Sequence, residues 1–223
     1  MHLKRKNAMK FKLAIIALTA ALMFAPTAYA GLTLDELMDK VETRHAGTGF
    51  SARFLQQSTI KAMDITDNAN GKIQVKRPGM MRWEYEKPTK QVIVSDGQEL
   101  WVHKPQDNQV MIGKAADYFG DGKGASFLSD IRLIRKNFTL SLEKEKEGYH
   151  VIKLLPKEKK FDISAIYLSV SKKTFEIEKV ITYNSYEDET IIQMTNYQFN
   201  QDIDNSVFRF TIPQGAEVLQ MEE

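Results

Sequence analysis

Apolar and polar residues alternate along much of this chain after residue 48, which is the period of a β-strand with one buried face. Two such stretches, 72–76 and 81–86, lie on either side of Pro78. Their apolar positions are Ile73 and Val75 in the first, and Met81, Trp83 and Tyr85 in the second. The pattern predicts two neighbouring strands joined near the proline, after a turn at 64–71 (DITDNANG).

Arg77 falls on the same side as Ile73 and Val75, where the pattern otherwise places apolar residues. A guanidinium keeps its charge and is costly to bury without partners. We therefore expect Arg77 to find specific hydrogen-bond acceptors on the apolar side of its strand.

Residues 91–103 (QVIVSDGQELWVH) have the pattern of a β-hairpin. A three-residue loop at 95–97, with Gly97 in the left-handed conformation, would pair Val92 with Leu100. One face of this predicted hairpin carries Val92, Val94, Leu100 and Val102.

Two segments have helical rather than strand periodicity. Residues 32–45 place Leu34, Leu37, Met38 and Val41 on one face, and Thr33 with Glu36 forms a capping box. Residues 115–137 read as two short helical pieces around a glycine-rich joint at 120–124. The apolar face of the second piece carries Phe127, Leu128, Ile131 and Ile134.

Further alternating stretches complete the predicted fold. They are 49–60, 110–112, 138–145, 149–157, 165–172, 175–184, 190–199 and 207–212. The fold class is mainly β (α+β), a single incomplete antiparallel β-barrel of about ten or eleven strands with an N-terminal helix and inserted helices. The helices either fill the concave face as an ordinary core or form a lid over a cavity, and periodicity leaves both interpretations open.

Residues 1–30 have the pattern of a secretory signal peptide. Five basic residues lie within the first twelve positions, and an apolar run follows at 13–24. Ala28-Tyr29-Ala30 supplies the small residues that signal peptidase needs. We expect cleavage after Ala30 and one mature domain at 31–223. A membrane anchor is the alternative, but the apolar run is shorter than the roughly 20 residues that span a bilayer. Either Met1 or Met9 could be the residue at which translation starts.

Composition and motifs exclude several functions. Without the five basic leader residues, 26 of the 31 Lys and Arg remain against 29 Asp and Glu, so nothing favours nucleic-acid binding. Cysteine is absent, which excludes disulfides and a lipid-modified cysteine. The histidines of the predicted mature chain, His45, His103 and His150, are scattered, and no nucleophile, metal or nucleotide motif occurs. We expect no enzyme activity, no metal and no cofactor.

Three stretches resemble the family of periplasmic outer-membrane lipoprotein carriers (LolA). They are VKRPGMMRWEYEKP at 75–88, QVIVSDGQELWVHKPQDNQV at 91–110 and FRFTIPQGAEV at 208–218. Their order is that of the family. Two features are specific: Trp83 five residues after the proline of Lys76-Arg77-Pro78, and the hairpin with Ser95-Asp96-Gly97 followed by Leu100-Trp101. The resemblance implies an incomplete barrel whose helices form a lid over a hydrophobic cavity for the acyl chains of lipoproteins.

The resemblance also assigns roles to residues. Arg77 matches the family's lid latch, which holds the empty cavity closed. With the alternation, it predicts a cavity lined by Val75, Met81, Trp83, Tyr85, Val92, Val94, Leu100 and Val102. The predicted lid residues are Leu37, Met38, Val41, Phe127, Leu128 and Ile131.

The implied partners are acylated lipoproteins as cargo, an inner-membrane lipoprotein-releasing ABC transporter that loads the carrier, and an outer-membrane lipoprotein acceptor. The carrier would act as a monomer in the periplasm. The alternative function is a periplasmic lipid-binding or lipoprotein-sensing protein of the same fold.

Overall fold

The computed structural model describes residues 31–119, 126–144, 146–158 and 162–221. The chain divides into two units, Met1–Leu32 and Thr33–Glu223. The predicted signal peptide lies outside the described residues, as does the glycine-rich joint at 120–124. In the described ranges, no helix is both long enough and apolar enough to cross a lipid bilayer.

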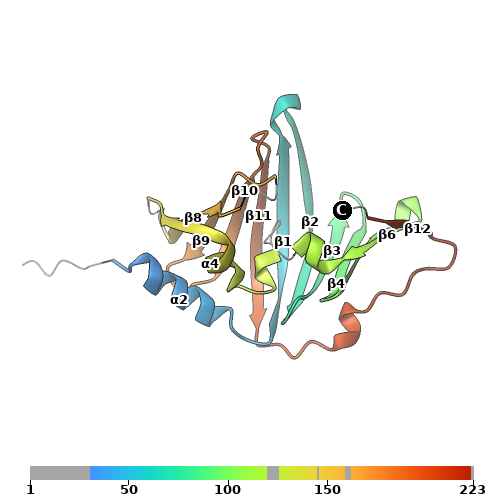
Figure 1. Cartoon of the computed structure of the whole chain (residues 1–223), viewed down its shortest axis with the longest axis horizontal. Coiled ribbons are helices and arrows are strands. Elements are labelled where there is room, and N and C mark those ends of the chain that lie inside the picture. The colour runs from blue at the N-terminus through green and yellow to red at the C-terminus, as the bar shows by residue number, and fades with distance from the viewer. Residues whose placement is uncertain (1–30, 120–125, 145, 159–161, 222–223) are drawn as a thin grey trace, which may run out of the picture. The chain divides into compact units, whose positions relative to one another are not determined.

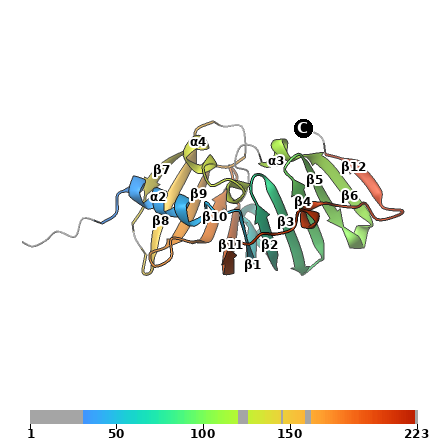
Figure 2. The ribbon, with the colours of Figure 1, turned by 90° about the horizontal axis from the view of Figure 1, so that it is seen from below.

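Twelve strands, counted over the described residues, form one curved sheet that does not close on itself (Figure 1, Figure 2). In spatial order they are β12 (Glu217–Gln220), β6 (Gln109–Lys114), β5 (Glu99–Lys104), β4 (Gln91–Asp96), β3 (Met80–Lys87), β2 (Ile65–Lys76), β1 (Gly49–Ile60), β11 (Glu189–Phe199), β10 (Ile177–Tyr183), β9 (Ala165–Ser171), β8 (Tyr149–Pro156) and β7 (Phe138–Leu142). Neighbours are antiparallel except β12, which runs parallel to β6. The predicted fold class is confirmed.

Four of the helical segments lie on one side of this sheet (Figure 1, Figure 2). They are α2 (Leu34–Arg44), α3 (Ala115–Phe119), the 3₁₀ turn η3 (Ser126–Leu128) and α4 (Leu133–Asn137). Helix α2 begins with the predicted capping box, in which Thr33 Oγ1 accepts from the Glu36 amide at 3.3 Å. We call α2, η3 and α4 together the lid segments.

The face of the sheet beneath the lid segments is apolar, and we call it the inner face. On β1 to β3, cross-strand pairing aligns Phe50, Val75 and Met81 in one row, and Ala52, Ile73 and Trp83 in the next. On the other half of the sheet, the same face carries Ile152, Leu154, Ile166, Leu168, Val180 and Ile192, all buried. Strand alternation thus concentrates the large apolar side chains on one face.

The predicted register of the β4–β5 hairpin is wrong. Ser95 pairs with Leu100, because the Asp96 carboxylate accepts the amides of Gln98 and Glu99 at 2.8 Å each and closes a shorter turn. Since the register differs by an odd number of residues, the faces exchange. Val92 and Val94 therefore lie on the outer face, whereas Leu100 and Val102 lie on the inner face with Ser95 and Ile93.

The predicted strand at 207–212 is also wrong. Its first residues belong to a 3₁₀ turn, η4 (Asn205–Phe208), and Phe210 packs on the outer face, 6.3 Å from the Trp101 ring. Val94, Trp101 and Val110 form a buried cluster there, and this C-terminal segment covers it. The apolar residues of 207–212 therefore serve as a cover for the outer face, and the chain adds β12 afterwards.

The turn predicted at 64–71 is likewise wrong, because β2 already begins at Ile65. Pairing with β1 continues from Gly49 opposite Lys76 to Ile60 opposite Ile65, so both strands are twelve residues long. The actual turn consists of η1 (Lys61–Met63) and Asp64, which has a left-handed backbone with φ 53°.

Candidate functional site

Arg77 connects the sheet to the loop that follows α2 and to the lid segment η3. From the turn between β2 and β3, its Nη1 donates to the Gly47 carbonyl just after α2 at 2.7 Å, and its Nη2 donates to the Leu128 carbonyl of η3 at 3.3 Å. Its backbone amide donates to the Thr48 carbonyl at 2.8 Å. The guanidinium carbon also lies 5.8 Å from the centre of the Phe50 ring. The arginine that alternation placed on the apolar face is thus bonded to the segments that cover this face.

The acceptors of Arg77 are neutral, which distinguishes it from a buried ion pair. Burial lowers the pKa of Arg77, and the nearby Asp130 carboxylate opposes this shift. Asp130 itself is bonded to Arg132 at 2.8 and 2.9 Å, which holds the pKa of that carboxyl below its usual value. The Nε of Arg77 has no hydrogen-bond partner among the described residues. Arg77 is therefore held by carbonyl dipoles and not by a carboxylate of its own.

A cavity of about 610 Å³ opens beside this arginine. Its walls are the end of α2 with His45 and Ala46, the Arg77–Pro78 turn and residues 130–132. Here the edge of the lid segments is not packed tightly against the sheet.

A second arginine joins the lid segments to each other. From α4, Arg135 donates through Nε to Glu42 at 2.6 Å and through Nη1 to Asp35 at 3.0 Å, and it also pairs with Asp39. These three carboxylates lie on one side of α2 at positions i, i+4 and i+7. Helices α2 and α4 are therefore linked by a charged cluster, which sequence reasoning missed because about a hundred residues separate the partners.

An aromatic cluster occupies the inner face on β1 to β3. The Phe54 ring lies 5.0 Å from the Trp83 ring and 5.0 Å from the Tyr85 ring, in edge-to-face contacts. Gly71 lies between Phe54 and Tyr85 in the row, and a Cβ there would lie 1.9 Å from the Glu84 carbonyl oxygen. Tyr85 donates its hydroxyl to Gln56 at 3.0 Å, and burial raises its pKa to about 12.

The structure brings most of the predicted site residues together. Those on the inner face are Val75, Met81, Trp83, Leu100 and Val102, all buried, and Tyr85, which is half-buried. Val92 and Val94 are not among them, for the reason given above. The predicted lid residues Leu37, Met38, Val41, Phe127, Leu128 and Ile131 are all buried. Phe54 and Ile93 were missed, although the alternation of 49–60 already placed Phe54 on an apolar face.

His45 is buried where α2 meets the sheet. It lies among the rings of Phe50, Tyr197 and Phe199, at centroid distances of 6.5, 6.4 and 5.4 Å. Its Nδ1 donates to the Val41 carbonyl at 2.9 Å, while Nε2 has no partner among the described residues. Burial lowers the pKa of His45 to about 4, so the ring is neutral at pH 7.

Comparison with known proteins identifies the family. Residues 46–211 match the family model described as outer membrane lipoprotein carrier protein LolA. The chain belongs to the LolA family. It is 30% identical over 206 residues to the outer-membrane lipoprotein carrier protein of Dechloromonas aromatica, which covers 92% of this chain and 95% of that relative. With the carrier of Methylobacillus flagellatus it shares 32% identity over 168 residues, or 75% and 80% of the two chains.

A solved structure has a similar fold. The crystal structure of an uncharacterized conserved protein from Thermus thermophilus matches 84% of this chain and 98% of its own, with a TM-score of 0.53 and 16% identity. At that identity the likeness concerns the fold alone. LolA proteins are periplasmic, non-enzymatic lipoprotein carriers. The predicted family and lack of enzyme activity are confirmed, and the predicted compartment is that of the family.

Proposed function

We propose that this protein binds the acyl chains of lipoproteins released by an inner-membrane ABC transporter and carries them, as a monomer, to an outer-membrane acceptor. The acyl chains would lie against the inner face, under the lid segments. The observation that carries this proposal is Arg77, a charged residue on an apolar face that is bonded to the loop after α2 and to η3, which covers that face.

The energetics of the cargo explain why such a protein needs a lid that can open. Each buried CH₂ contributes about 0.8 kcal/mol, so three acyl chains of roughly fifteen CH₂ groups would cost roughly 35 kcal/mol to expose to water. Non-covalent affinities reach a limit near −18 to −21 kcal/mol, and a carrier must also release its cargo. An apolar face that covers itself when empty reduces the net affinity for cargo and makes release possible.

Arg77 is suited to this competition. Opening the lid segments would break its bonds to the Gly47 and Leu128 carbonyls. A hydrogen bond to a charged group contributes about 1.5–3 kcal/mol, so the closed empty state would be favoured by an energy of this order. Because the acceptors are neutral carbonyls, water can replace them when the lid opens. We therefore assign to Arg77 the role of a reversible latch.

The test replaces Arg77 by leucine and compares it with Arg82→Leu. Arg82 also donates to a carbonyl, that of Val207 at 3.2 Å, but it lies on the outer face. Arg77→Leu should fold and bind lipoprotein, yet pass it to the acceptor at least ten times more slowly, because the closed empty state has lost stability. Arg82→Leu should transfer cargo normally. Normal transfer by Arg77→Leu would refute the latch.

The carrier role is tested separately on the protein purified from its own periplasm. Native mass spectrometry should find triacylated lipoprotein bound to it, and the mature N-terminus should be Gly31 if cleavage follows Ala30. Bound free lipid without lipoprotein would contradict the carrier role and favour a lipid-binding protein.

A further inference from the structure

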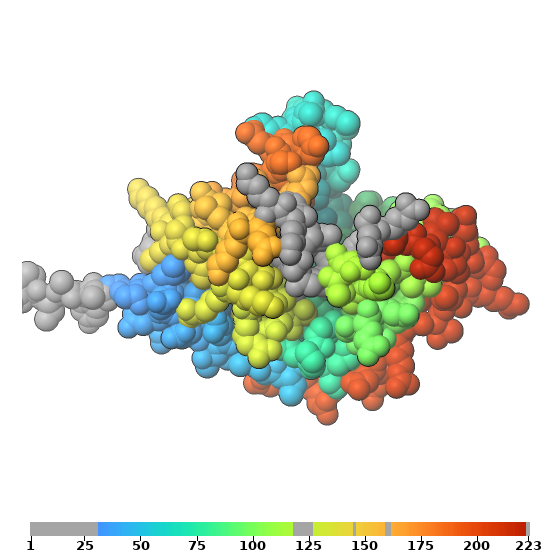
Figure 3. Space-filling view, in the orientation of Figure 1, coloured from blue at the N-terminus to red at the C-terminus, as the bar shows by residue number. Residues whose placement is uncertain are grey.

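The β1–β2 hairpin extends beyond the end of the neighbouring strand β3. Pairing of β2 with β3 stops at Asn70 opposite Lys87, whereas pairing with β1 continues to Ile65. In the space-filling view, the end of this hairpin stands out from the rest of the domain, and the turn between β10 and β11 lies beside it (Figure 3). We call these two turns together, residues 60–67 and 184–189, the tip. The tip is thus built from two turns that are far apart in the sequence.

The two turns are bonded to each other. The Lys61 amide donates to the Asp188 carboxylate at 2.9 Å, and the Lys61 ammonium pairs with Glu187. Within the hairpin, the hydroxyls of Thr59 and Thr66 share a hydrogen bond of 3.0 Å. The tip is therefore preformed and does not need a partner to order it.

Large apolar side chains are exposed on this tip. The exposed fractions are 39% for Ile60, 66% for Met63, 46% for Ile65 and 73% for Tyr186. None of them takes part in the buried core, and three of them lie within six residues. Exposed apolar residues scattered singly are normal, but a cluster on a projecting, rigid tip indicates an interaction surface. Met63 at the turn is an adaptable contact residue.

The charges around the tip select the kind of partner. Within 60–67 and 184–189 the acidic residues are Asp64, Asp67, Glu187, Asp188 and Glu189, and Lys61 is the single basic one. Such a surface is repelled by anionic lipid headgroups, which attract lysine and arginine. It is complementary to a protein pocket that is apolar in its centre and bordered by basic residues.

From these observations we propose that the tip is a docking site for a partner protein with an apolar pocket bordered by Lys or Arg. The proposal rests on the proposed function, in which the carrier must bind two proteins in turn. The base of the hairpin, at Gly49 and Lys76, adjoins Arg77. Twelve strand residues separate base and tip by about 40 Å. A partner bound at the tip would therefore hold the carrier without obstructing the latch.

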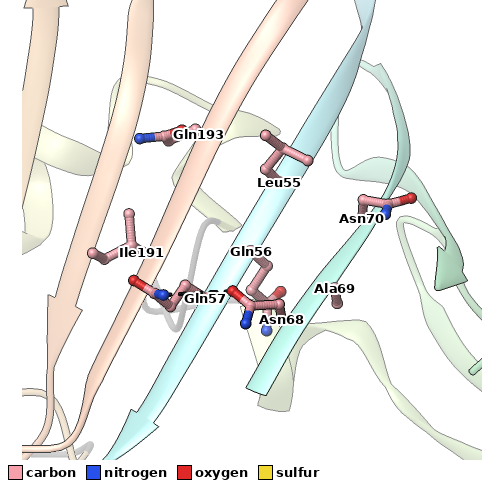
Figure 4. A pocket seen from close by; sticks show the side chains of 8 residues that line it. All are labelled: Leu55, Gln56, Gln57, Asn68, Ala69, Asn70, Ile191 and Gln193. Atoms are coloured by element: carbon pink, nitrogen blue, oxygen red, sulfur yellow. Dashed lines mark hydrogen bonds between the residues drawn. The ribbon is translucent and has the colours of Figure 1, made fainter. Parts of the chain in front are cut away.

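The experiment compares Met63→Gln with Leu55→Gln in the full mature protein. Leu55 is 55% exposed on the same strand, about five residues or roughly 17 Å from the tip. It borders a shallow cavity of about 310 Å³ whose other walls include Gln57, Asn68, Asn70 and Gln193 (Figure 4). Both substitutions remove one exposed apolar side chain from a long hairpin, so they are matched.

Affinity is measured by surface plasmon resonance with the purified transporter and, separately, the purified acceptor. Met63→Gln should weaken binding to at least one of them by tenfold or more, while Leu55→Gln changes it by less than twofold. Wild-type binding should also weaken as salt rises, because the predicted border is basic. Unchanged binding of Met63→Gln to both proteins would overturn the proposal.

Two further measurements separate the alternatives. Wild-type protein should not bind vesicles of phosphatidylethanolamine and phosphatidylglycerol, and binding that Met63→Gln abolishes would overturn the proposal in favour of a lipid surface. Cargo binding is measured with detergent-solubilised lipoprotein and no partner, where Met63→Gln should equal wild type. If wild type itself binds no lipoprotein, the proposed function fails; if cargo binding falls only in Met63→Gln, the docking role fails.

Discussion

The stability of the fold should fall in mildly acidic solution because of His45. The folded protein keeps this ring neutral down to about pH 4, whereas the unfolded chain takes up the proton near the ordinary pKa of 6.5. Between these values the unfolded state binds more protons, so stability is complete above pH 6.5 and is lost as the pH falls. Burial is the main cause, and the charges of Arg77 and Arg44 add to it.

The size of the effect follows from the two pKa values. One pKa unit corresponds to 1.36 kcal/mol, so between pH 7.5 and pH 4.5 the His45 contribution to the free energy of unfolding should fall by about 2.5 kcal/mol. Urea unfolding at the two pH values measures this difference. Other groups also titrate in this range, so the same measurement is made on His45→Phe, which keeps a ring in the aromatic cluster and cannot bind a proton.

His45→Phe should be less stable than wild type at pH 7.5, since the bond to the Val41 carbonyl is lost. Between the two pH values, its free energy of unfolding should nevertheless fall by about 2.5 kcal/mol less than that of wild type. The matched control is His103→Phe, a half-buried histidine that also contacts an aromatic ring and leaves His45 in place. If His45→Phe and wild type show the same pH dependence, the burial argument is refuted.

Three more substitutions test the inner face and the lid segments. Met81→Glu should impair lipoprotein loading, because Met81 is 1% exposed and an unpaired carboxylate there is costly; unchanged loading would place Met81 outside the cavity. Gly71→Ala should lower the free energy of unfolding by about 2 kcal/mol or more, measured in urea, since the new Cβ would collide with the Glu84 carbonyl. Arg135→Gln should cost only about 1 kcal/mol of stability, because the pairs are partly exposed, yet should speed amide exchange in α2. Unaltered exchange there would show that the charged cluster does not hold α2.

The alternation of apolar and polar residues was sufficient to predict which residues share a face within one strand. The period of two places Phe50 with Ala52, Val75 with Ile73, and Met81 with Trp83 on one face of their own strands, and it also places Arg77 on the apolar side of its strand. These residues share a face whatever strand lies beside them, because alternation depends only on the local backbone.

Features that depend on a partner could not be predicted in this way. The faces of Val92 and Val94 depended on the loop length, which the Asp96 carboxylate decides by binding two amides. The stretch 64–71 has the composition of a turn, but pairing with β1 overrides it. Residues 207–212 alternate like a strand, yet they cover an outer-face cluster that exists only because Val94 and Trp101 face outward. Each error concerns a pairing or contact that the alternation within one strand does not specify.

Arg77 of the sheet and Arg135 of α4 hold the lid segments through different kinds of partner, and the difference fits a lid that moves as one body. Arg135 pairs with carboxylates, so the link between α2 and α4 is charged on both sides. Arg77 is bonded to neutral carbonyls across the boundary between lid and sheet, and water can replace these carbonyls when the two separate. The bonds of Arg135 lie within the lid segments, so on the proposed function cargo that enters between lid and sheet would break the bonds of Arg77 and leave those of Arg135 intact. Release would need only the reverse of that step, which requires no chemical energy within the carrier itself.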